Sequence, residues 1–226
     1  MNSDLLEGMD RPCTLLVVLP HPDDESFATG GVLSKYSKDP EVRTVVLCLS
    51  KGGESGALDK VGLPAEREPI IREKEFATAT AILNVDKAIL WEYMDGKLNE
   101  VEVEELKERI ANVIRDEKAD VVITYGPDGI TGHPDHKTCS RIVKEACLDE
   151  SVKRLFMVTA PAWMGKTFLG QELMPITHGI DIRDEYRVKM LALKSHASQM
   201  LISMQPMIWV GVIMRIFGKE FYHRVI

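Results

Sequence analysis

The 226-residue sequence has few cysteines and no long apolar run. The four cysteines are widely spaced and form no Cys-x-x-Cys pair, so we expect free thiols in a reducing compartment. The longest strongly apolar stretch, 207–214, is much shorter than the ~20 residues that a bilayer-spanning helix needs. Residues 1–11 are polar and acidic, unlike a secretory signal. These absences predict a cytoplasmic protein with no membrane span.

The sequence also lacks a basic excess, because 28 Lys and Arg stand against 35 Asp and Glu, a formal net charge of −7. Dedicated nucleic-acid binders usually carry a surplus of basic residues, so we expect no nucleic-acid partner. There is no P-loop, and no Gly-x-Gly-x-x-Gly motif follows the first predicted strand, which argues against a dinucleotide site. No repeat or linker divides the chain, so a single domain over 1–226 is expected.

Short β-branched runs alternate with helical patterns along the chain. The runs show no inside–outside alternation, which predicts strands covered on both faces, as in a parallel sheet. The predicted strands are 14–19, 42–49, 87–91, 120–125 and 154–159, with an edge strand at 179–182. The predicted helices are 25–37, 68–83, 102–117, 135–148 and 183–197. This alternation predicts an α/β fold, a doubly wound, mostly parallel sheet with helices on both faces.

Residues 198–226 break this pattern and contain methionine and aromatic residues with few charges. One interpretation is a carboxy-terminal segment packed on the core. The other is a subunit interface, because methionine and aromatic side chains suit adaptable contact surfaces. Under the second interpretation, residues 200–217 would be buried between subunits.

Two motifs rich in histidine and aspartate follow two of the predicted strands. His21-Pro22-Asp23-Asp24-Glu25 comes after strand 14–19, and Gly132-His133-Pro134-Asp135-His136 comes after strand 120–125. Ligands of open α/β sheets bind beyond the carboxyl ends of the strands, at the point where the strand order reverses. The first and fourth strands are neighbours there in the common strand orders. We therefore expect the two motifs to meet.

Histidine and aspartate together are the donors that a divalent cation needs. Catalytic zinc takes three protein ligands and leaves one position for water. The two motifs supply more carboxylates than such a site requires, so one of them is free to act as a base. A single His-Pro-Asp motif at a helix start is more simply a helix cap. Two such motifs at one predicted edge of the sheet favour a metal site.

At these motifs the chain resembles the PIG-L / LmbE-like deacetylase family, whose members include N-acetylglucosaminyl-phosphatidylinositol deacetylase and the deacetylases of mycothiol and bacillithiol synthesis. The resemblance covers most of the chain. Its supporting matches are Gly53-Glu54, Arg72-x-x-Glu75, Asp95-Gly96 and the stretch from Lys189 to His196-x-Ser198-Gln199. It implies a Rossmann-like fold and a hydrolase that releases acetate from an N-acetylglucosamine-type small-molecule conjugate. The rest of the conjugate stays open: a diacetylchitobiose-type sugar and a thiol-biosynthesis precursor both fit.

The resemblance also implies a metal centre and a base. The metal ligands would be His21, Asp24 and His136, holding Zn²⁺ in most members of the family and Fe²⁺ in some. Asp23 would be the general base that takes a proton from the attacking water. Some relatives form hexamers, so a homo-oligomer is expected.

Further roles follow for residues around this centre. By the resemblance, His133 would stabilise the oxyanion as an imidazolium and protonate the leaving amine, Asp135 would orient His133, and Arg72 would contact the substrate. The loop after the second strand lines the same predicted cleft, which makes Glu54 a candidate substrate contact. Asp128 is a second candidate, through sugar hydroxyls, although an Asp before Gly also suits a plain turn.

Three further features stay open. Residues 51–67 are flexible enough in composition to act as a lid. Thr131 stands where some thiol-sugar deacetylases carry a tyrosine. Tyr125 is interpreted as a strand-end residue, and His196 either caps a helix end or lines the site.

Two other function classes compete with the deacetylase. One is a non-catalytic sugar or nucleotide-sugar binding module with a structural metal, against which the spare carboxylate of Asp23 argues. The other is a non-haem Fe(II) oxygenase, because His21-x-Asp23 with a distant histidine mimics a 2-His-1-carboxylate triad. That triad usually occurs in a β-barrel, whereas this chain alternates strands and helices.

Overall fold

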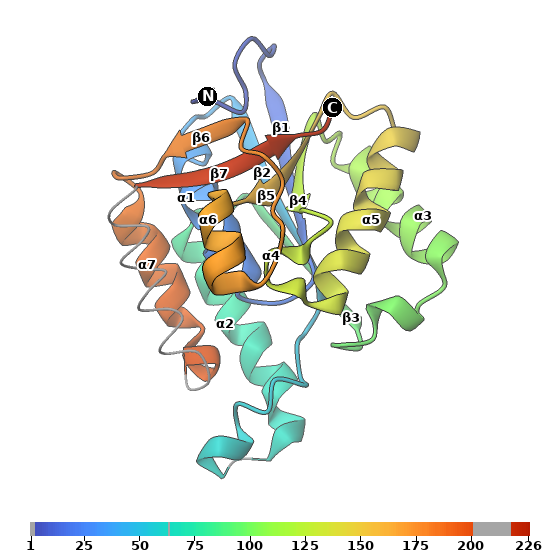
Figure 1. Ribbon diagram of the computed structural model, residues 1–226, viewed down its shortest axis with the longest axis vertical. Coiled ribbons are helices and arrows are strands. Elements are labelled where there is room, and N and C mark those ends of the chain that lie inside the picture. Colours follow the sequence, from blue (N-terminus) through green and yellow to red (C-terminus); the bar gives the residue numbers. More distant parts are fainter. Residues whose placement is uncertain (1–2, 63, 201–217) are drawn as a thin grey trace.

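The computed structural model describes residues 3–62, 64–200 and 218–226. Its strands form one sheet in the order β3-β2-β1-β4-β5-β7-β6 (Figure 1). The strands are β1 Cys13–Leu19, β2 Val42–Ser50, β3 Lys87–Tyr93, β4 Val121–Tyr125, β5 Arg154–Thr159, β6 His178–Asp181 and β7 Lys219–Arg224. The longer helices are α1 Asp24–Tyr36, α2 Glu68–Ile82, α3 Val103–Asp116, α5 Pro134–Asp149 and α7 Tyr186–Ser195. Shorter helical turns are α4 Gly129–Gly132, α6 Ala162–Met164, Asp59–Val61, Ala65–Arg67, Leu98–Glu100 and Gly165–Leu169.

Strand β1 lies at the centre of the sheet, between β2 and β4. Leu15 pairs with Thr44 on one side and with Val121 on the other, and both pairings are parallel. The predicted neighbourhood of the first and fourth strands is therefore confirmed. The strand order reverses between them, so the loops after β1 and β4 meet at the carboxyl edge of the sheet.

Helices cover both faces of the sheet, as its sequence pattern predicts. Leu15 and Val17 of β1 belong to the core layer under α1, α2 and α7, whereas Leu16 and Val18 belong to the layer under α3 and α5. Figure 1 shows the two groups of helices on opposite sides of the strands. Because both faces of β1 are buried, the strand reads as one continuous apolar run.

Strand β7 corrects the sequence-based prediction, which placed no strand after 182. It runs antiparallel between β5 and β6, pairing Phe156 with Arg224 and Ile180 with Glu220. Its sequence, Lys-Glu-Phe-Tyr-His-Arg, is short and largely polar, so it does not resemble the apolar runs of the parallel strands. The interface hypothesis for 200–217 concerns residues that, apart from residue 200, lie outside the described part of the chain. Within the described ranges, no helix has the length and apolar character needed to cross a bilayer.

Candidate metal and catalytic site

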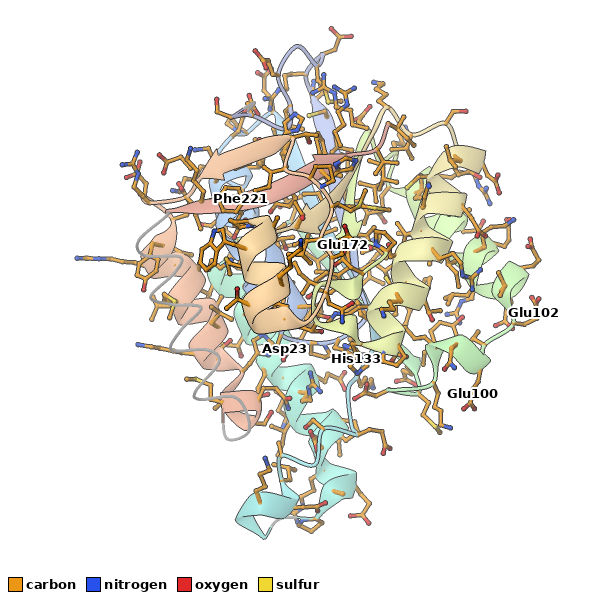
Figure 2. All side chains as sticks on the ribbon, in the orientation of Figure 1. Asp23, Glu100, Glu102, His133, Glu172 and Phe221 are labelled. Carbon is orange, nitrogen blue, oxygen red and sulfur yellow. The ribbon has the colours of Figure 1, made fainter. Side chains whose placement is uncertain are left out.

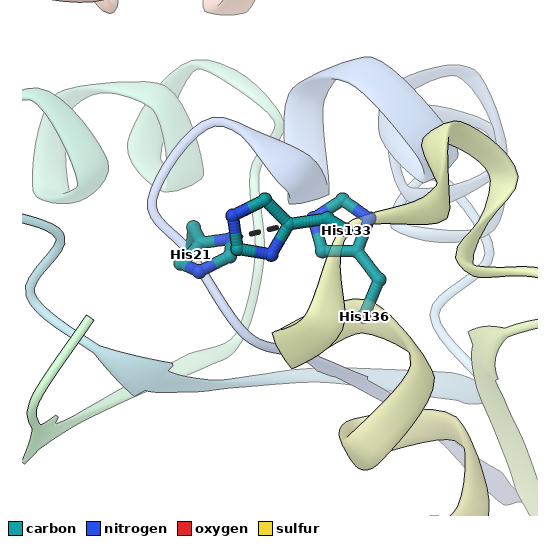
Figure 3. Close-up of side chains that lie close together, drawn as sticks. All are labelled: His21, His133 and His136. Atoms are coloured by element: carbon teal, nitrogen blue, oxygen red, sulfur yellow. Dashed lines mark hydrogen bonds between the residues drawn. The ribbon is translucent and has the colours of Figure 1, made fainter. Parts of the chain in front are cut away.

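The two histidine loops meet at the carboxyl edge of the sheet. His21 follows β1 and His136 lies in the first turn of α5, and their Nδ1 and Nε2 atoms are 3.3 Å apart (Figure 3). The ring of His133 lies 4.8 Å from that of His21 and 5.0 Å from that of His136, measured between centroids. Three imidazoles from two loops thus share one small space.

Asp24 completes a triangle of donor atoms with His21 and His136. Its Oδ2 lies 3.4 Å from His21 Nδ1, and its Oδ1 lies 3.5 Å from His136 Nε2. Ligands at ~2.0–2.1 Å from a tetrahedral zinc ion are separated from one another by about 3.3–3.5 Å. All three side chains are buried. The spacing of the triangle therefore suits a zinc-sized ion.

Hydrogen bonds on the far sides of both rings fix which nitrogens face the triangle. His21 Nε2 lies 2.9 Å from Asp95 Oδ1 and 3.2 Å from Asp135 Oδ2, and His136 Nδ1 lies 3.0 Å from the carbonyl oxygen of Gly129. With these contacts on their far sides, His21 Nδ1 and His136 Nε2 face each other and Asp24. Metal-ligating histidines are commonly oriented in this way. Three such donors facing one space suit a cation between them.

The charges of the ligands agree with this interpretation. Burial alone would raise the pKa of Asp24, but His136, His21 and the hydroxyl of Tyr125 hold it below its ordinary value. Burial alone would lower the pKa of His21, but the carboxylates of Asp135, Asp24 and Asp95 raise it well above its ordinary value. Asp24 is thus ionised at neutral pH, and the carboxylates around His21 favour positive charge on or beside its ring.

Asp23 stands beside the triangle, and its carboxylate lies 3.5 Å from the Arg72 guanidinium. It precedes α1 as the N-cap residue but makes no capping hydrogen bond, which contradicts the simple cap interpretation for this motif. Its backbone has φ 116° and ψ −30°, a conformation that costs a non-glycine residue about 1–3 kcal/mol. Its side chain is 32% exposed and lines a pocket of about 230 Å³ together with His136, Thr131 and His196. Figure 2 shows Asp23 and His133 at the same end of the sheet.

The surroundings tune Asp23 for proton transfer. Burial raises its pKa to about 6; the guanidinium of Arg72 opposes that rise and the carboxylate of Asp24 adds to it. A general base works best when its pKa lies near the working pH. The position and the pKa of Asp23 both suit the base that the sequence predicts.

The structure corrects the predicted pairing of Asp135 with His133. The Asp135 carboxylate accepts hydrogen bonds from the backbone N–H groups of Gly96 and Leu98, at 2.7 and 3.1 Å, and contacts His21. Its contact with His133 runs through the backbone: the Asp135 N–H donates to His133 Nδ1 at 3.2 Å, with His133 as the N-cap of α5. The first turn of α5 directs the carboxylate toward His21. His133 therefore carries its ring proton on Nε2.

Arg72, Asp128 and Glu54, the three predicted substrate contacts, do not line the pocket beside Asp23. Arg72 is only 3% exposed, donates to the carbonyl oxygen of Pro22 and lies 3.5 Å from Asp23 Oδ1; it is not among the residues that line the pocket. Asp128 caps α4 by accepting the N–H of Ile130 at 2.7 Å, and it is not among the residues that line the pocket.

Glu54 is exposed and lines a neighbouring hollow of about 330 Å³ beside Asp95. It precedes the helical turns Asp59–Val61 and Ala65–Arg67, which project from the body of the molecule at the bottom of Figure 1. Of the three residues, Glu54 is the exposed one, and contact of each with a bound molecule stays a prediction.

Two site residues were not assigned roles from the sequence. Asp95 anchors His21 and is itself held by the backbone N–H groups of Gly53 and Glu54, at 2.9 and 3.2 Å from its Oδ2. Tyr125 is a buried strand-end residue, as predicted, but its hydroxyl donates to Asp24 Oδ1 at 2.6 Å. For Asp95, the only sequence signal was the Asp95-Gly96 match. For Tyr125, the only signal was its position at the end of a predicted strand.

Comparison with protein families matches residues 16–147 to the family described as PIG-L: GlcNAc-PI de-N-acetylase. The chain belongs to the PIG-L family. Among PIG-L-type relatives, the 1D-myo-inositol 2-acetamido-2-deoxy-α-D-glucopyranoside deacetylase of Nocardiopsis dassonvillei is 29% identical, over 83% of this chain and 84% of that protein. The probable N-acetyl-α-D-glucosaminyl L-malate deacetylase 2 of Bacillus anthracis is 31% identical, over 82% of this chain and 80% of that protein.

Solved structures confirm the fold. The N,N′-diacetylchitobiose deacetylase of Pyrococcus horikoshii superposes with a TM-score of 0.76 at 20% identity, over 96% of this chain and 84% of that one. The 4-carboxy-2-hydroxymuconate hydratase GalB of Pseudomonas putida superposes with a TM-score of 0.71 at 17% identity, over 95% of this chain and 96% of that one. One fold thus supports both a deacetylase and a hydratase, so the reaction has to be argued from the site.

Proposed function

We propose that this PIG-L family member is a zinc-dependent hydrolase that removes the acetyl group of an N-acetylglucosamine-type conjugate. One observation carries the proposal: the buried His21–Asp24–His136 triangle stands beside the Asp23 carboxylate, which lines a pocket together with Asp24 and His136. The donor set of two imidazoles and one carboxylate matches catalytic zinc better than a closed structural site. The names of the two sequence relatives support the same reaction class.

The residues divide the work of hydrolysis between them. Zn²⁺ held by the triangle would supply Lewis acidity, polarising the acetamide carbonyl and lowering the pKa of water at the site. Asp23 takes a proton from the attacking water. His133 donates a hydrogen bond from Nε2 to the carbonyl oxygen as negative charge develops on it.

The protonation of the leaving amine also falls to Asp23 in this proposal. His133 accepts the Asp135 N–H on Nδ1, and its Nε2 is assigned to the carbonyl oxygen. Asp23 has by then received a proton from water, and a carboxylic acid with a pKa of about 6 readily passes it to an amine. The C–N bond breaks, and acetate and a free amine leave. This assignment replaces the expected role of His133 as the acid.

The four cysteines are all free and buried, which suits the reducing compartment that their spacing predicts. The expected homo-oligomer, including a hexamer, stays a prediction. The oxygenase alternative loses support because the strands form an open sheet flanked by helices and not a barrel.

The test is metal-dependent acetate release. Purified protein is stripped with a chelator, analysed for metal, and assayed on N-acetylglucosaminyl L-malate, N-acetylglucosaminyl inositol and N,N′-diacetylchitobiose before and after addition of Zn²⁺ or Fe²⁺. We expect release from at least one conjugate, lost on stripping and restored by one equivalent of zinc. Stoichiometric zinc binding without acetate from any conjugate would favour the binding module instead.

A further inference from the structure

Glu25 is a buried carboxylate beside the site that the proposed reaction does not use. It is 1% exposed and accepts three hydrogen bonds. Its Oε2 receives the backbone N–H of Asp23 at 3.0 Å, and its Oε1 receives the hydroxyl of Ser26 at 2.6 Å and His196 Nε2 at 2.8 Å. A carboxylate this buried with all its partners donating is a fixed anchor.

The anchor holds one end of the peptide unit that joins Pro22 to Asp23. At the other end of the same unit, the carbonyl oxygen of Pro22 accepts the guanidinium of Arg72, which is itself buried. Rotation of this unit changes φ of Asp23 and breaks both contacts. The two side chains therefore clamp the peptide in the orientation that gives Asp23 its φ of 116°.

A capping box offers a simpler explanation of the Glu25 contact, and the structure does not fit it. In a capping box the N-cap side chain and the later carboxylate satisfy each other's backbone N–H groups. Here the Asp23 side chain makes no capping bond and Glu25 alone reaches back. The contact secures the backbone of Asp23 while leaving its carboxylate in the pocket.

His196 links this clamp to the end of α7. It is buried, it lines the pocket beside Asp23, and it follows Ser195, the last residue of that helix. Its Nε2 holds Glu25, and its Nδ1 is buried with no hydrogen-bond partner in the described part of the chain. The ring is thus committed to Glu25 alone.

We propose that Glu25 and Arg72 are positioning residues that clamp the Pro22–Asp23 peptide, with His196 holding Glu25, so that the strained backbone aims the Asp23 carboxylate at the reacting water. The proposal rests on the proposed function for its kinetic test. It assigns Arg72 to the support of the base, in place of contact with substrate. Loss of the clamp lets φ of Asp23 relax to negative values and withdraws the base, while the metal ligands stay in place.

The kinetic test compares Glu25→Ala with Glu25→Gln. The glutamine keeps an oxygen for the Asp23 N–H, and its NH₂ donates to His196 Nε2 in the other tautomer, since Nδ1 has no competing partner. With zinc content verified and the hydrolysed conjugate as substrate, we expect Glu25→Ala to lower kcat by about 100-fold with KM changed less than about threefold. Glu25→Gln should recover kcat to within about fivefold of the wild type. An unchanged kcat in Glu25→Ala, or equal losses in both variants, would overturn the proposal.

Glu220→Gln is the matched control. Glu220 is also a buried carboxylate that accepts backbone N–H groups of α1, those of Gly31 and Val32 at 2.7 and 2.9 Å, but it does not touch the Asp23 peptide. This variant should melt at a lower temperature with kcat unchanged. If Glu220→Gln loses as much kcat as Glu25→Ala, general damage to α1 explains the effect of both variants, and the clamp proposal is refuted.

A crystal structure of zinc-loaded Glu25→Ala gives a readout that needs no substrate. We expect φ of Asp23 to become negative while His21, Asp24 and His136 keep their positions; a φ that stays near 116° would refute the clamp. If the wild type releases acetate from no conjugate, the proposed function fails and this structure still decides the clamp. If Glu25→Ala does not fold, His196→Leu takes its place in both measurements, with an expected loss in kcat of about tenfold.

Discussion

The rings of Tyr125 and His136 lie face to face, with centroids 4.2 Å apart and an interplanar angle of 7°. The hydroxyl of the same tyrosine donates to Asp24 Oδ1 at 2.6 Å. One buried side chain therefore fixes two ligands of the triangle, the imidazole by stacking and the carboxylate by a hydrogen bond. Such supporting contacts tune a metal site nearly as much as the ligands do.

Tyr125→Phe separates these two contacts, because phenylalanine keeps the ring and loses the hydroxyl. We expect the dissociation constant for zinc to rise about 10–100-fold, with little change in kcat at saturating zinc. Competition with a chromogenic chelator measures the affinity. An affinity equal to that of the wild type would show that the hydroxyl does not support Asp24.

Asp23→Asn tests the base directly, since the amide has the shape of the carboxylate but takes up no proton. We expect turnover to fall by about 10²–10⁴-fold with one zinc still bound per chain. Steady-state acetate release and elemental analysis on the same sample provide the measurement. Full activity in this variant would remove Asp23 from the mechanism.

Glu117 provides a stability prediction far from the site. Lys87 and Arg43, at 2.5 and 2.7 Å, hold its pKa below the ordinary value, Lys87 having the larger effect. A lowered folded-state pKa adds stability above the unfolded-state pKa of about 4.3, and this is lost as the pH falls through the folded value. Glu117→Gln should therefore lower the free energy of unfolding by about 1–3 kcal/mol at pH 7.

The difference between Glu117→Gln and the wild type should shrink below about pH 4.3 in urea titrations. Glu108→Gln is the control, because Glu108 pairs with Arg115 on the exposed surface and should change nothing measurable. A difference that stays constant down to acid pH would mean that shape, and not charge, explains the Glu117 effect.

The thiols give a reactivity prediction. Burial raises the pKa of both Cys139 and Cys147 to about 12, so about one thiol in 10,000 is a thiolate at pH 8. We expect iodoacetamide to leave all four buried cysteines unmodified in the native protein and to label them after unfolding in urea. Rapid labelling of the native protein, seen by intact mass, would contradict the burial.

The parallel strands and the meeting of the two motifs were predictable from the sequence. A strand that is buried on both faces consists of uninterrupted apolar residues, and this pattern is visible in the sequence. Val121 to Tyr125 shows this pattern, and so does the longer run of β1. In strand β7, by contrast, only every second residue points inward. The strand has six residues and is largely polar, so its sequence shows no clear periodicity.

The direction of individual side chains was the part that spacing could not give. Asp135 turns toward His21 because the first turn of α5 fixes the direction of its side chain. Asp95 follows β3, and it reaches His21 because the sheet brings the ends of β3 and β1 to the same edge, with only β2 between them. Glu25 is adjacent to the ligand Asp24 in sequence, yet its partner His196 comes 171 residues later. These contacts exist only in the folded chain.

The position of β7 in the sheet also affects the order in which parts of the protein can fold during synthesis. Among the described strands, β6 has β7 as its one neighbour, so residues 178–181 have no position in the sheet until residues 219–224 have left the ribosome. Glu220, on β7, then supplies the carboxylate that binds the middle of α1. The helix that presents Asp24 and Glu25 thus receives one of its supports from a residue that is made 188 residues after Val32.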